Sequence, residues 1–146
     1  MKRCLGGDIE LDDDKARIDR EAVHRWLSEV SYWATGRPRA TQDYLIDGAA
    51  RVVGLYDGET QIGFARAWTD TVSFVYLADV YVLEEYRGRK LGEELVRFMI
   101  EDSDFADVRW LLHTTNMHAL YKKFGFGDPD YKVMERRATS HSSDAG

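Results

Sequence analysis

The spacing of apolar residues divides the chain into segments with the periods of strands and helices. Residues 77–83 are mostly aliphatic or aromatic, which is typical of a buried strand. From residue 91 onward the apolar positions recur at i, i+4, i+7 and i+8, which places them on one face of an α-helix. That face consists of Leu91, Leu95, Phe98 and Met99. The charged segment 84–90 lies between, so the pattern predicts a strand, a basic loop, and a helix that begins between residues 87 and 92.

The same criteria predict further elements on both sides of this unit. Toward the N-terminus we expect a short strand at 8–11, a helix from Arg20 capped by Asp19, a short helix capped by Thr41, and strands at 51–56 and 61–68 joined by Asp57-Gly58. Toward the C-terminus we expect an antiparallel strand at 73–83, the helix at 91–102, a short strand at 109–114, a helix with Asn116 as its N-cap and Gly125 as its C-cap, and a last strand at 131–137. In the strand at 61–68, alternation places Ile62, Phe64, Arg66 and Trp68 on one face.

This order of elements indicates an α/β fold with a central mixed, mostly antiparallel sheet and helices on both faces. The strand at 109–114 is expected to pair parallel with the strand before the helix, through a right-handed crossover. A chain of 146 residues suffices for one domain with a core. We expect that domain over residues 1–137, and disorder in the polar, serine-rich segment 138–146.

Composition and charge narrow the classes of function. The net charge of −6 argues against nucleic acid as a partner. No apolar run approaches the ~20 residues of a membrane span, and the first residues lack the apolar core of a secretory signal, so no membrane partner is expected. The single cysteine, Cys4, cannot form an internal disulfide, which suits a cytoplasmic location. Histidine and cysteine do not cluster at ligand spacing, so no metal is expected.

The basic loop and the start of the following helix together suggest an anion site. The first amides of a helix lack intrahelical partners, and the helix dipole makes that end electropositive. Arg87, Arg89 and Lys90 add positive charge, and glycines let a ligand approach the backbone closely. A phosphate or pyrophosphate would fit such a site. A solvated basic turn before an ordinary helix is the alternative, and this loop alone does not decide between the two.

Two segments resemble the GNAT acetyltransferase superfamily. Residues 87–92, Arg-Gly-Arg-Lys-Leu-Gly, are similar to its acyl-CoA loop, [Q/R]-x-x-G-x-[G/A], with Lys90 in place of the middle glycine. Residues 120–126, Leu-Tyr-Lys-Lys-Phe-Gly-Phe, look like the LYxKxGF segment that begins the last helix of that superfamily. The two segments have the order and spacing of the superfamily. Together with the strand pattern, the resemblance covers residues 21–137.

The resemblance implies acetyl-CoA as co-substrate and assigns residues to it. In that superfamily the sheet splays beside the strand before the loop, and the thioester arm pairs there with strand backbone. The corresponding backbone here belongs to Val80, Tyr81 and Val82. The loop that would hold the pyrophosphate consists of Arg87, Gly88, Arg89, Lys90, Leu91 and Gly92. Tyr121 matches a tyrosine that often donates a proton to the departing thiolate, and simple packing of its ring is the alternative.

Asp79 interrupts an apolar strand directly before the backbone assigned to the co-substrate. A buried carboxylate is costly unless it is paired or hydrogen-bonded. Three roles stay open: a catalytic general base, a site that binds a cationic amine, or a structural carboxylate. Arg66 is a candidate partner for it. His113 and His118 flank the start of the last predicted helix, and either could relay a proton.

The leading hypothesis is an acetyl-CoA-dependent N-acetyltransferase that moves an acetyl group to the amine of a small molecule by direct attack on the thioester. A non-catalytic acyl-CoA-binding or sensory module on the same fold is one alternative. A protein or peptide N-acetyltransferase is another, and an extended peptide groove would distinguish it. A homodimer through exposed strands is compatible with the pattern.

Overall fold

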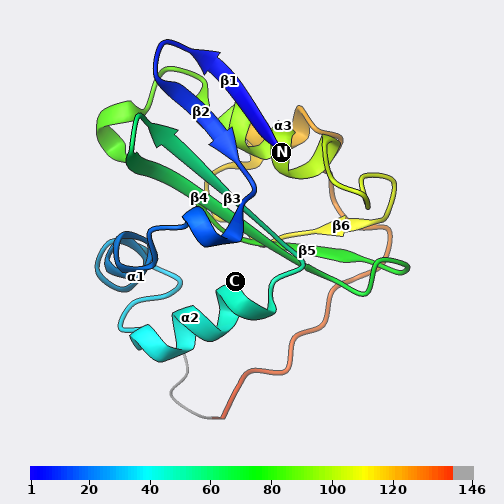
Figure 1. Ribbon diagram of the computed structural model, residues 1–146. Coiled ribbons are helices and arrows are strands. Elements are labelled where there is room, and N and C mark those ends of the chain that lie inside the picture. The colour runs from blue at the N-terminus through cyan, green and yellow to red at the C-terminus, as the bar shows by residue number, and fades with distance from the viewer. Residues whose placement is uncertain (140–146) are drawn as a thin grey trace.

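A six-stranded sheet forms the centre of the computed structural model, which describes residues 1–139. Its strands are, in spatial order, β1 (Lys2–Gly6), β2 (Ile9–Asp12), β3 (Arg51–Asp57), β4 (Thr60–Thr69), β5 (Val75–Val82) and β6 (Trp110–Leu111). The strands from β1 to β5 pair antiparallel with their neighbours, and β6 pairs parallel with β5 (Figure 1). The mixed, mostly antiparallel sheet predicted from the sequence is therefore confirmed.

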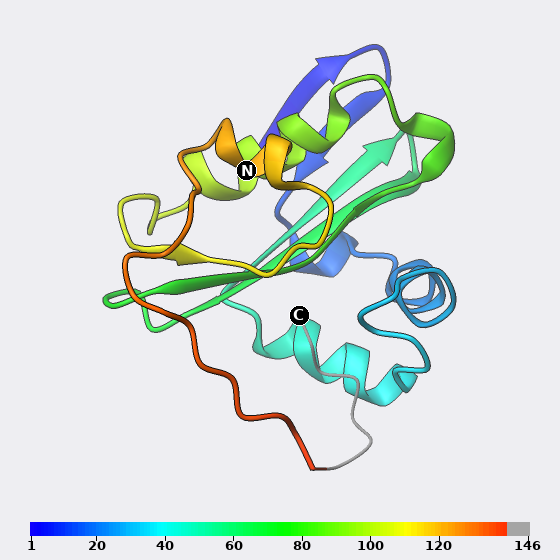
Figure 2. The ribbon, with the colours of Figure 1, turned by 180° about the vertical axis from the view of Figure 1, so that it is seen from behind.

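Helices cover both faces of the sheet, as predicted (Figures 1 and 2). On one face lie α1 (Arg20–Glu29) and α2 (Arg39–Gly48), which bury Val23, Leu27 and Ile46. On the other lie α3 (Leu91–Glu101) and the short α4 (His118–Lys122). Two short 3-10 helices, η1 (Lys15–Arg17) and η2 (Glu84–Tyr86), precede α1 and α3. The result is one apolar core on each side of the sheet.

The helices α1 and α3 begin differently. At α1, the side chain of Asp19 accepts a hydrogen bond from the amide of Ala22 (3.0 Å), as predicted for an N-cap. At α3 the residue in the cap position is Lys90, and its side chain makes no such bond. The apolar face predicted for α3 is buried, so packing against the sheet holds this helix in place. Among residues 1–139, its first amides consequently have no side-chain partner.

Two bulges interrupt the alternation of the central strands. An extra residue in β4 shifts its register against β3 between Gln61 and Gly63. The sequence pattern put Ile62 on the same face as Phe64, which is wrong, because this bulge turns Ile62 toward α3 while Phe64 packs with α1 and α2. The other bulge adds a residue to β5 between Ala78 and Tyr81. Asp79 lies within it and has a φ of 55°, in the left-handed region.

Some predictions for the N-terminal half are wrong in detail. The predicted strand at 8–11 is β2, but a further strand, β1, precedes it and forms a hairpin through Gly6 and Gly7. The helix α2 begins at Arg39, after Pro38, and not at a cap on Thr41. Proline lacks an amide hydrogen, which costs nothing at the start of a helix where that group would have no partner.

The C-terminal part is less regular than predicted. β6 has only two residues, and α4 begins at His118, so that Met117 and not Asn116 occupies its cap position. Gly125 has a φ of 87°, which confirms it as the left-handed residue that ends this helix. The predicted strand at 131–137 is wrong: the segment has no regular structure, and Tyr131 and Met134 are exposed. A two-residue β6 offers too short an edge for another strand. Disorder was predicted for 138–146, and residues 140–146 of that segment lie outside the described residues.

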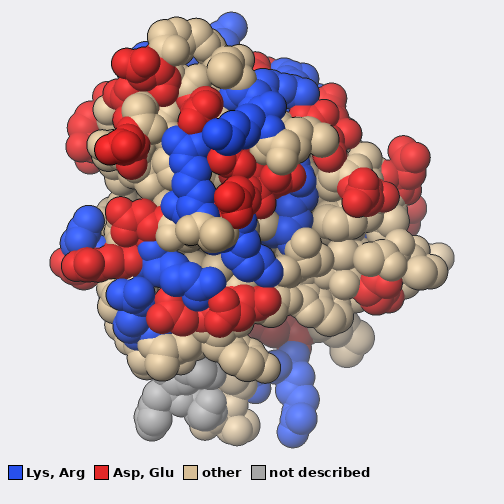
Figure 3. All heavy atoms as spheres, viewed as in Figure 1, with Lys and Arg blue, Asp and Glu red and all other residues tan. Residues whose placement is uncertain are grey.

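Charged side chains of both signs alternate over the face of the molecule that carries β1 and β2 (Figure 3). Arg17 pairs there with Glu10 (2.6 Å) and Asp12 (3.1 Å), and Arg51 pairs with Asp13 (2.7 Å). This face therefore offers no continuous basic surface to a nucleic acid. Within residues 1–139, no helix has the length and apolar character needed to cross a membrane.

Candidate active site

The strand β5 is paired on both sides at its start and on one side at its end. Its parallel pairing with β6 comprises only Val75 with Trp110 and Tyr76 with Leu111. Beyond these pairs, this edge of β5 has no strand partner among residues 1–139. The backbone of residues 80–82, which the resemblance assigns to the thioester arm, lies in that unpaired part. Such an edge can receive an extended ligand as though it were a further strand.

The motif from Arg87 to Gly92 follows η2 and includes the first two residues of α3. Gly88 has a φ of 83° and Lys90 a φ of 61°, so both are left-handed. Glycine adopts this conformation freely, whereas for lysine it costs about 1–2 kcal/mol. The lysine in place of the middle glycine of the motif thus keeps a backbone conformation typical of glycine. The first amides of α3 remain directed at the loop.

Gly92 has space for a larger side chain within the protein. A Cβ built on it would approach only Val82, at 3.9 Å, which is an ordinary contact. A glycine within a helix lowers the stability of a protein by roughly 0.5–1 kcal/mol relative to alanine. Since a larger side chain would fit at position 92, packing within the protein does not explain why glycine is there. A ligand that approaches the first turn of α3 would give one. The contact with Val82 also shows that the start of α3 and the unpaired end of β5 lie side by side.

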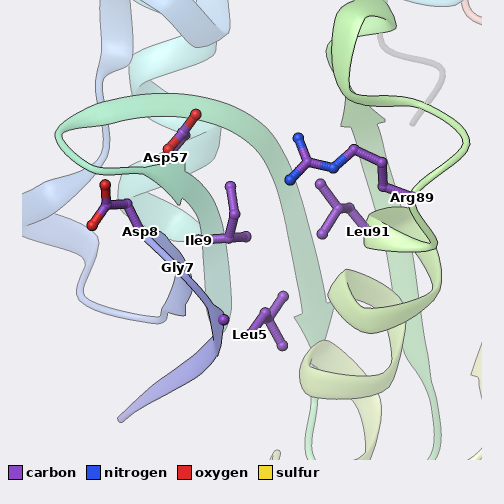
Figure 4. A pocket seen from close by; sticks show the side chains of 8 residues that line it. Leu5, Gly7, Asp8, Ile9, Asp57, Arg89 and Leu91 are labelled. Atoms are coloured by element: carbon purple, nitrogen blue, oxygen red, sulfur yellow. The ribbon is translucent and has the colours of Figure 1, made fainter.

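The two arginines of the loop point in different directions. The Nε of Arg87 donates to the carbonyl of Val82 at 3.4 Å, back toward the end of β5. Arg89 extends over Leu91 into a hollow of about 410 Å³ beside the turn between β1 and β2 (Figure 4). Two carboxylates line the same hollow, those of Asp8 and Asp57. The β5 side of the loop, with Arg87, is therefore the more favourable side for a phosphate.

Tyr121 packs in the core on the α3 side of the sheet and is 8% exposed. Its ring meets that of Phe126 edge-on, with the ring centres 5.6 Å apart. Burial, with a smaller contribution from Tyr32, raises the pKa of Tyr121 to about 12. The phenol is consequently protonated at neutral pH. Within residues 1–139 nothing forms a hydrogen bond with its hydroxyl, so the proton is available to a ligand.

Three donors surround the buried carboxylate of Asp79. Its Oδ1 accepts from Nε1 of Trp33 (2.9 Å), and its Oδ2 accepts from Arg37 (2.9 Å) and from Nε of Arg66 (2.6 Å). The predicted pairing with Arg66 is therefore confirmed. Burial acts to raise the pKa of Asp79, but the charges of Arg66 and Arg37 and the hydrogen bonds outweigh it and hold the pKa below its ordinary value.

This environment favours the structural role of Asp79 over the two other roles considered from the sequence. A general base at neutral pH benefits from a raised pKa, and a lowered pKa weakens it. A cationic amine would have to displace a guanidinium group. The carboxylate instead ties the loop between α1 and α2, through Trp33 and Arg37, to the bulge of β5.

The loop between α1 and α2 supplies a charged residue, Arg37, whose role sequence reasoning missed. Arg37 is 1% exposed and donates to Gln42 as well as to Asp79. The hydroxyl of Tyr32 accepts a hydrogen bond from Thr115 at 2.8 Å, which joins this loop to the segment after β6. The aromatic pair Tyr32 and Trp33, which follows α1, marks this loop in the sequence. Arg37 carried no signal, because a loop arginine is ordinarily solvated.

The histidines named from the sequence lie after β6. His113 has its Nδ1 2.6 Å from the hydroxyl of Tyr76, and His118 is the first residue of α4 and exposed. In the part of the chain that the structure describes, no three His, Cys, Asp or Glu residues are placed to hold a metal ion.

The sheet opens beside the uncapped start of α3, and Tyr121 lies in the core on that side of the sheet. The chain belongs to the Acetyltransferase (GNAT) family, whose sequence model matches residues 20–126. A crystal structure of a GNAT-family protein from Xanthomonas campestris pv. campestris covers 89% of this chain and 93% of its own, with a TM-score of 0.84 and 32% identity.

Two further relatives agree with this family. A Gibberella zeae protein provisionally named an acetyltransferase is 31% identical over 84% of this chain and 81% of its own length. Mycothiol acetyltransferase of Corynebacterium efficiens is 26% identical over 86% of this chain, but the match spans only 44% of that protein. The resemblance found in the two sequence segments is therefore confirmed at the level of the family, and the acceptor has to be argued from the site.

Proposed function

We propose that this protein is an acetyl-CoA-dependent N-acetyltransferase that acetylates the amine of a small molecule. The observation that carries the proposal is the continuity of the unpaired edge of β5 with the uncapped start of α3. A ligand with an extended arm and a pyrophosphate would use both features at once.

The residues present suit acetyl-CoA. Backbone groups of residues 80–82 would pair with the amide groups of its arm, and the first amides of α3 together with Arg87 would bind its pyrophosphate. The open space at Gly92 is what a close approach of phosphate to the helix requires. Lys90 adds a cation to the loop, and its left-handed backbone keeps the conformation that a glycine would adopt there.

Bound acetyl-CoA supplies an acetyl group activated as a thioester. In the transfer, the nitrogen of the unprotonated amine bonds to the carbonyl carbon, the carbon–sulfur bond breaks, and its electron pair stays on sulfur. Tyr121 donates a proton to that sulfur. Either of the histidines that follow β6, His113 or His118, takes the proton that the amine releases, and proton exchange with water restores Tyr121.

Asp79 has a positioning role in this proposal. By holding Trp33 and Arg37 against the bulge of β5, it fixes the wall of the acceptor site next to the backbone that would bind the thioester. The bond between Tyr32 and Thr115 crosses from this wall to the segment after β6. A bridge at that place supports a small acceptor, since an extended peptide would have to break it.

The test incubates the whole chain with acetyl-CoA and each of a panel of amines, and measures the release of free thiol. We expect release that depends on the amine, and binding of CoA by calorimetry. Binding of CoA without amine-dependent release across the panel would support the acyl-CoA-binding module instead. Absence of CoA binding at millimolar concentration would overturn the proposal.

Two further expectations belong to this proposal. The exposed Cys4 is compatible with a cytoplasmic location, and β1 and β6 are the two edge strands through which a homodimer could form.

A further inference from the structure

The hollow into which Arg89 extends lies between three segments that are far apart in the chain. It is lined by the turn between β1 and β2, the end of β3, and the start of α3 with the residues before it (Figure 4). Its volume of about 410 Å³ is at the lower end of the range for small-molecule pockets, roughly 300–1,000 Å³, so it suits a small metabolite. The proposed acetyl transfer uses the β5 side of the loop and leaves this hollow without a role.

Two side chains of opposite charge line the hollow without pairing. Arg89 and Asp57 lie on opposite sides of it (Figure 4), and within residues 1–139 no ion pair joins them. Tyr86 contacts both: its hydroxyl donates to Oδ2 of Asp57 at 2.7 Å, and the guanidinium of Arg89 lies 5.5 Å from the centre of its ring. In the same part of the chain, Oδ1 of Asp57 and the side-chain nitrogens of Arg89 form no hydrogen bond. Both residues therefore have hydrogen-bonding capacity for a ligand that lies between them.

The floor of the hollow is apolar. The side chains of Leu5, Ile9 and Leu91 lie beneath the two charged groups in Figure 4. Ile9 and Leu91 are each 7% exposed and belong to the core on the α3 side of the sheet, and Leu5 packs against that core. A Cβ built on Gly6 or Gly7 of the turn would meet nothing within 4 Å, so this side of the hollow is open. An aliphatic group that entered it would remove further apolar surface from water.

The charges of the lining determine which kind of ligand fits. Asp8 lines the hollow as well, so carboxylates outnumber the arginine and disfavour a phosphate or another simple anion. A simple cation would leave the guanidinium of Arg89 without a partner. A molecule with one carboxylate and one ammonium group would satisfy both sides. Its carboxylate matches the parallel N–H groups of a guanidinium, and its ammonium group donates to Asp57.

Arg89 also connects the hollow to the loop that would bind the co-substrate. It precedes Lys90, the left-handed residue in the cap position of α3, and Leu91 is the first residue of that helix. A ligand that contacts Arg89 and Leu91 would stabilise the loop in the conformation that leaves the first amides of α3 open. Occupancy of the hollow and binding of a pyrophosphate at these amides would then favour each other, because coupling between two binding sites is reciprocal.

We propose that this hollow is a second ligand site, which binds an amino acid with an aliphatic side chain and, when occupied, strengthens the binding of acetyl-CoA. Arg89 binds the carboxylate, Asp57 binds the ammonium group, and the aliphatic side chain lies on the apolar floor. The coupling rests on the proposed acetyltransferase function, whereas the binding of the amino acid does not.

The test titrates the whole chain, without CoA, with L-valine, L-leucine and L-isoleucine by calorimetry. The amino acid that binds best is compared with its carboxamide, which lacks the carboxylate, and with the corresponding acid, which lacks the ammonium group. We expect each analogue to bind at least about 10-fold more weakly, because each loses a hydrogen bond between charged groups. Equal binding of the amino acid and either analogue, or no binding of the three amino acids at millimolar concentration, would overturn the proposal.

Variants that remove one charge locate the bound amino acid. Asp57→Asn keeps an acceptor for Tyr86 and should weaken binding of the amino acid about 10-fold, with little effect on the acid analogue. Arg89→Gln should weaken it similarly, with little effect on the carboxamide. The control Glu59→Gln removes a carboxylate two residues from Asp57 that does not line the hollow, and should leave binding unchanged.

Either variant decides the location if the other does not fold. Binding that neither Asp57→Asn nor Arg89→Gln weakens would place the amino acid at another site, such as that of the acceptor, and would overturn the proposal.

A second titration measures the coupling. With the amino acid at saturation, the affinity for CoA should rise about 5-fold or more, and Asp57→Asn, which lies outside the co-substrate loop, should remove that gain. An affinity for CoA that the amino acid leaves unchanged would overturn the coupling. Absence of CoA binding while the amino acid still binds would contradict the proposed acetyltransferase function and uphold the amino-acid site.

Discussion

At the scale of single residues, the proposed chemistry depends most on Tyr121. Its pKa of about 12 keeps the phenol protonated, and no described residue competes for its hydroxyl. We predict that Tyr121→Phe lowers kcat by about 10²-fold or more, as expected for loss of a positioned acid, while the melting temperature changes little. Steady-state kinetics on an accepted amine, with a melting curve beside it, measure both.

The control for this variant is Tyr44→Phe, which removes the hydroxyl of a tyrosine that is 76% exposed on α2. It should match the wild type in both measurements. Wild-type turnover in Tyr121→Phe would rule out the acid role and leave Tyr121 as a packing residue.

Asp79 gives a prediction about stability and pH. Asp79→Asn leaves two buried guanidinium groups around a neutral side chain, so we expect a loss of about 3–5 kcal/mol in the free energy of unfolding at pH 7. Because the pKa of Asp79 is lower in the folded state, its contribution is complete above the ordinary carboxyl pKa of about 4 and disappears as the pH falls below that value. The gap between wild type and variant should therefore narrow in acid.

Urea unfolding at pH 7 and at pH 3 measures this gap. The control is Asp43, which pairs with Arg39 on the surface. Asp43→Asn should lower the free energy of unfolding by no more than about 1 kcal/mol. If Asp79→Asn instead keeps its stability, loses turnover and loses the acidic limb of the pH profile, Asp79 is the general base.

At the scale of elements, the start of α3 is the part most open to test. Gly92→Ala should bring a gain of about 0.5–1 kcal/mol in stability, since the protein has room for the methyl group and alanine favours the helix. Gly92→Asp should fold as well but bind CoA at least about 10-fold more weakly, because it places a negative charge beside the phosphates. Calorimetry with CoA on both variants distinguishes the two effects. Normal CoA affinity in a folded Gly92→Asp would mean that the phosphates bind elsewhere.

At the scale of the whole molecule, the ligand should stabilise the fold by mass action. A ligand at 100 times its dissociation constant adds about 2.7 kcal/mol if it binds only the folded state, which for a domain of this size raises the melting temperature by several degrees. We therefore expect CoA to raise the melting temperature, and adenosine, which lacks the pyrophosphate and the arm, to raise it less. An equal shift with both would contradict the use of the β5 edge and the α3 loop by one ligand.

The sequence determined most of the elements and the family, because these depend on local patterns. Periodicity placed α1, α3 and the strands from β3 to β5, the Asp19 cap is a local hydrogen bond, and residues 87–92 and 120–126 carry the motifs of the family. Local pattern failed where a bulge changes the alternation, as at Ile62, and where too little edge remains for pairing, as at 131–137.

Only the tertiary structure decided the roles of the charged residues. Asp79 and Arg37 are 42 positions apart in the chain, and nothing local to either residue predicts that they meet. Their meeting, together with the bulge that turns Asp79 inward, converts a candidate base into an ionised carboxylate with a lowered pKa. It also leaves the two terminal nitrogens of Arg66 without a hydrogen-bond partner among residues 1–139. A local pattern can predict that a side chain is buried, but its proton affinity and free hydrogen-bonding capacity depend on which distant groups the fold places beside it.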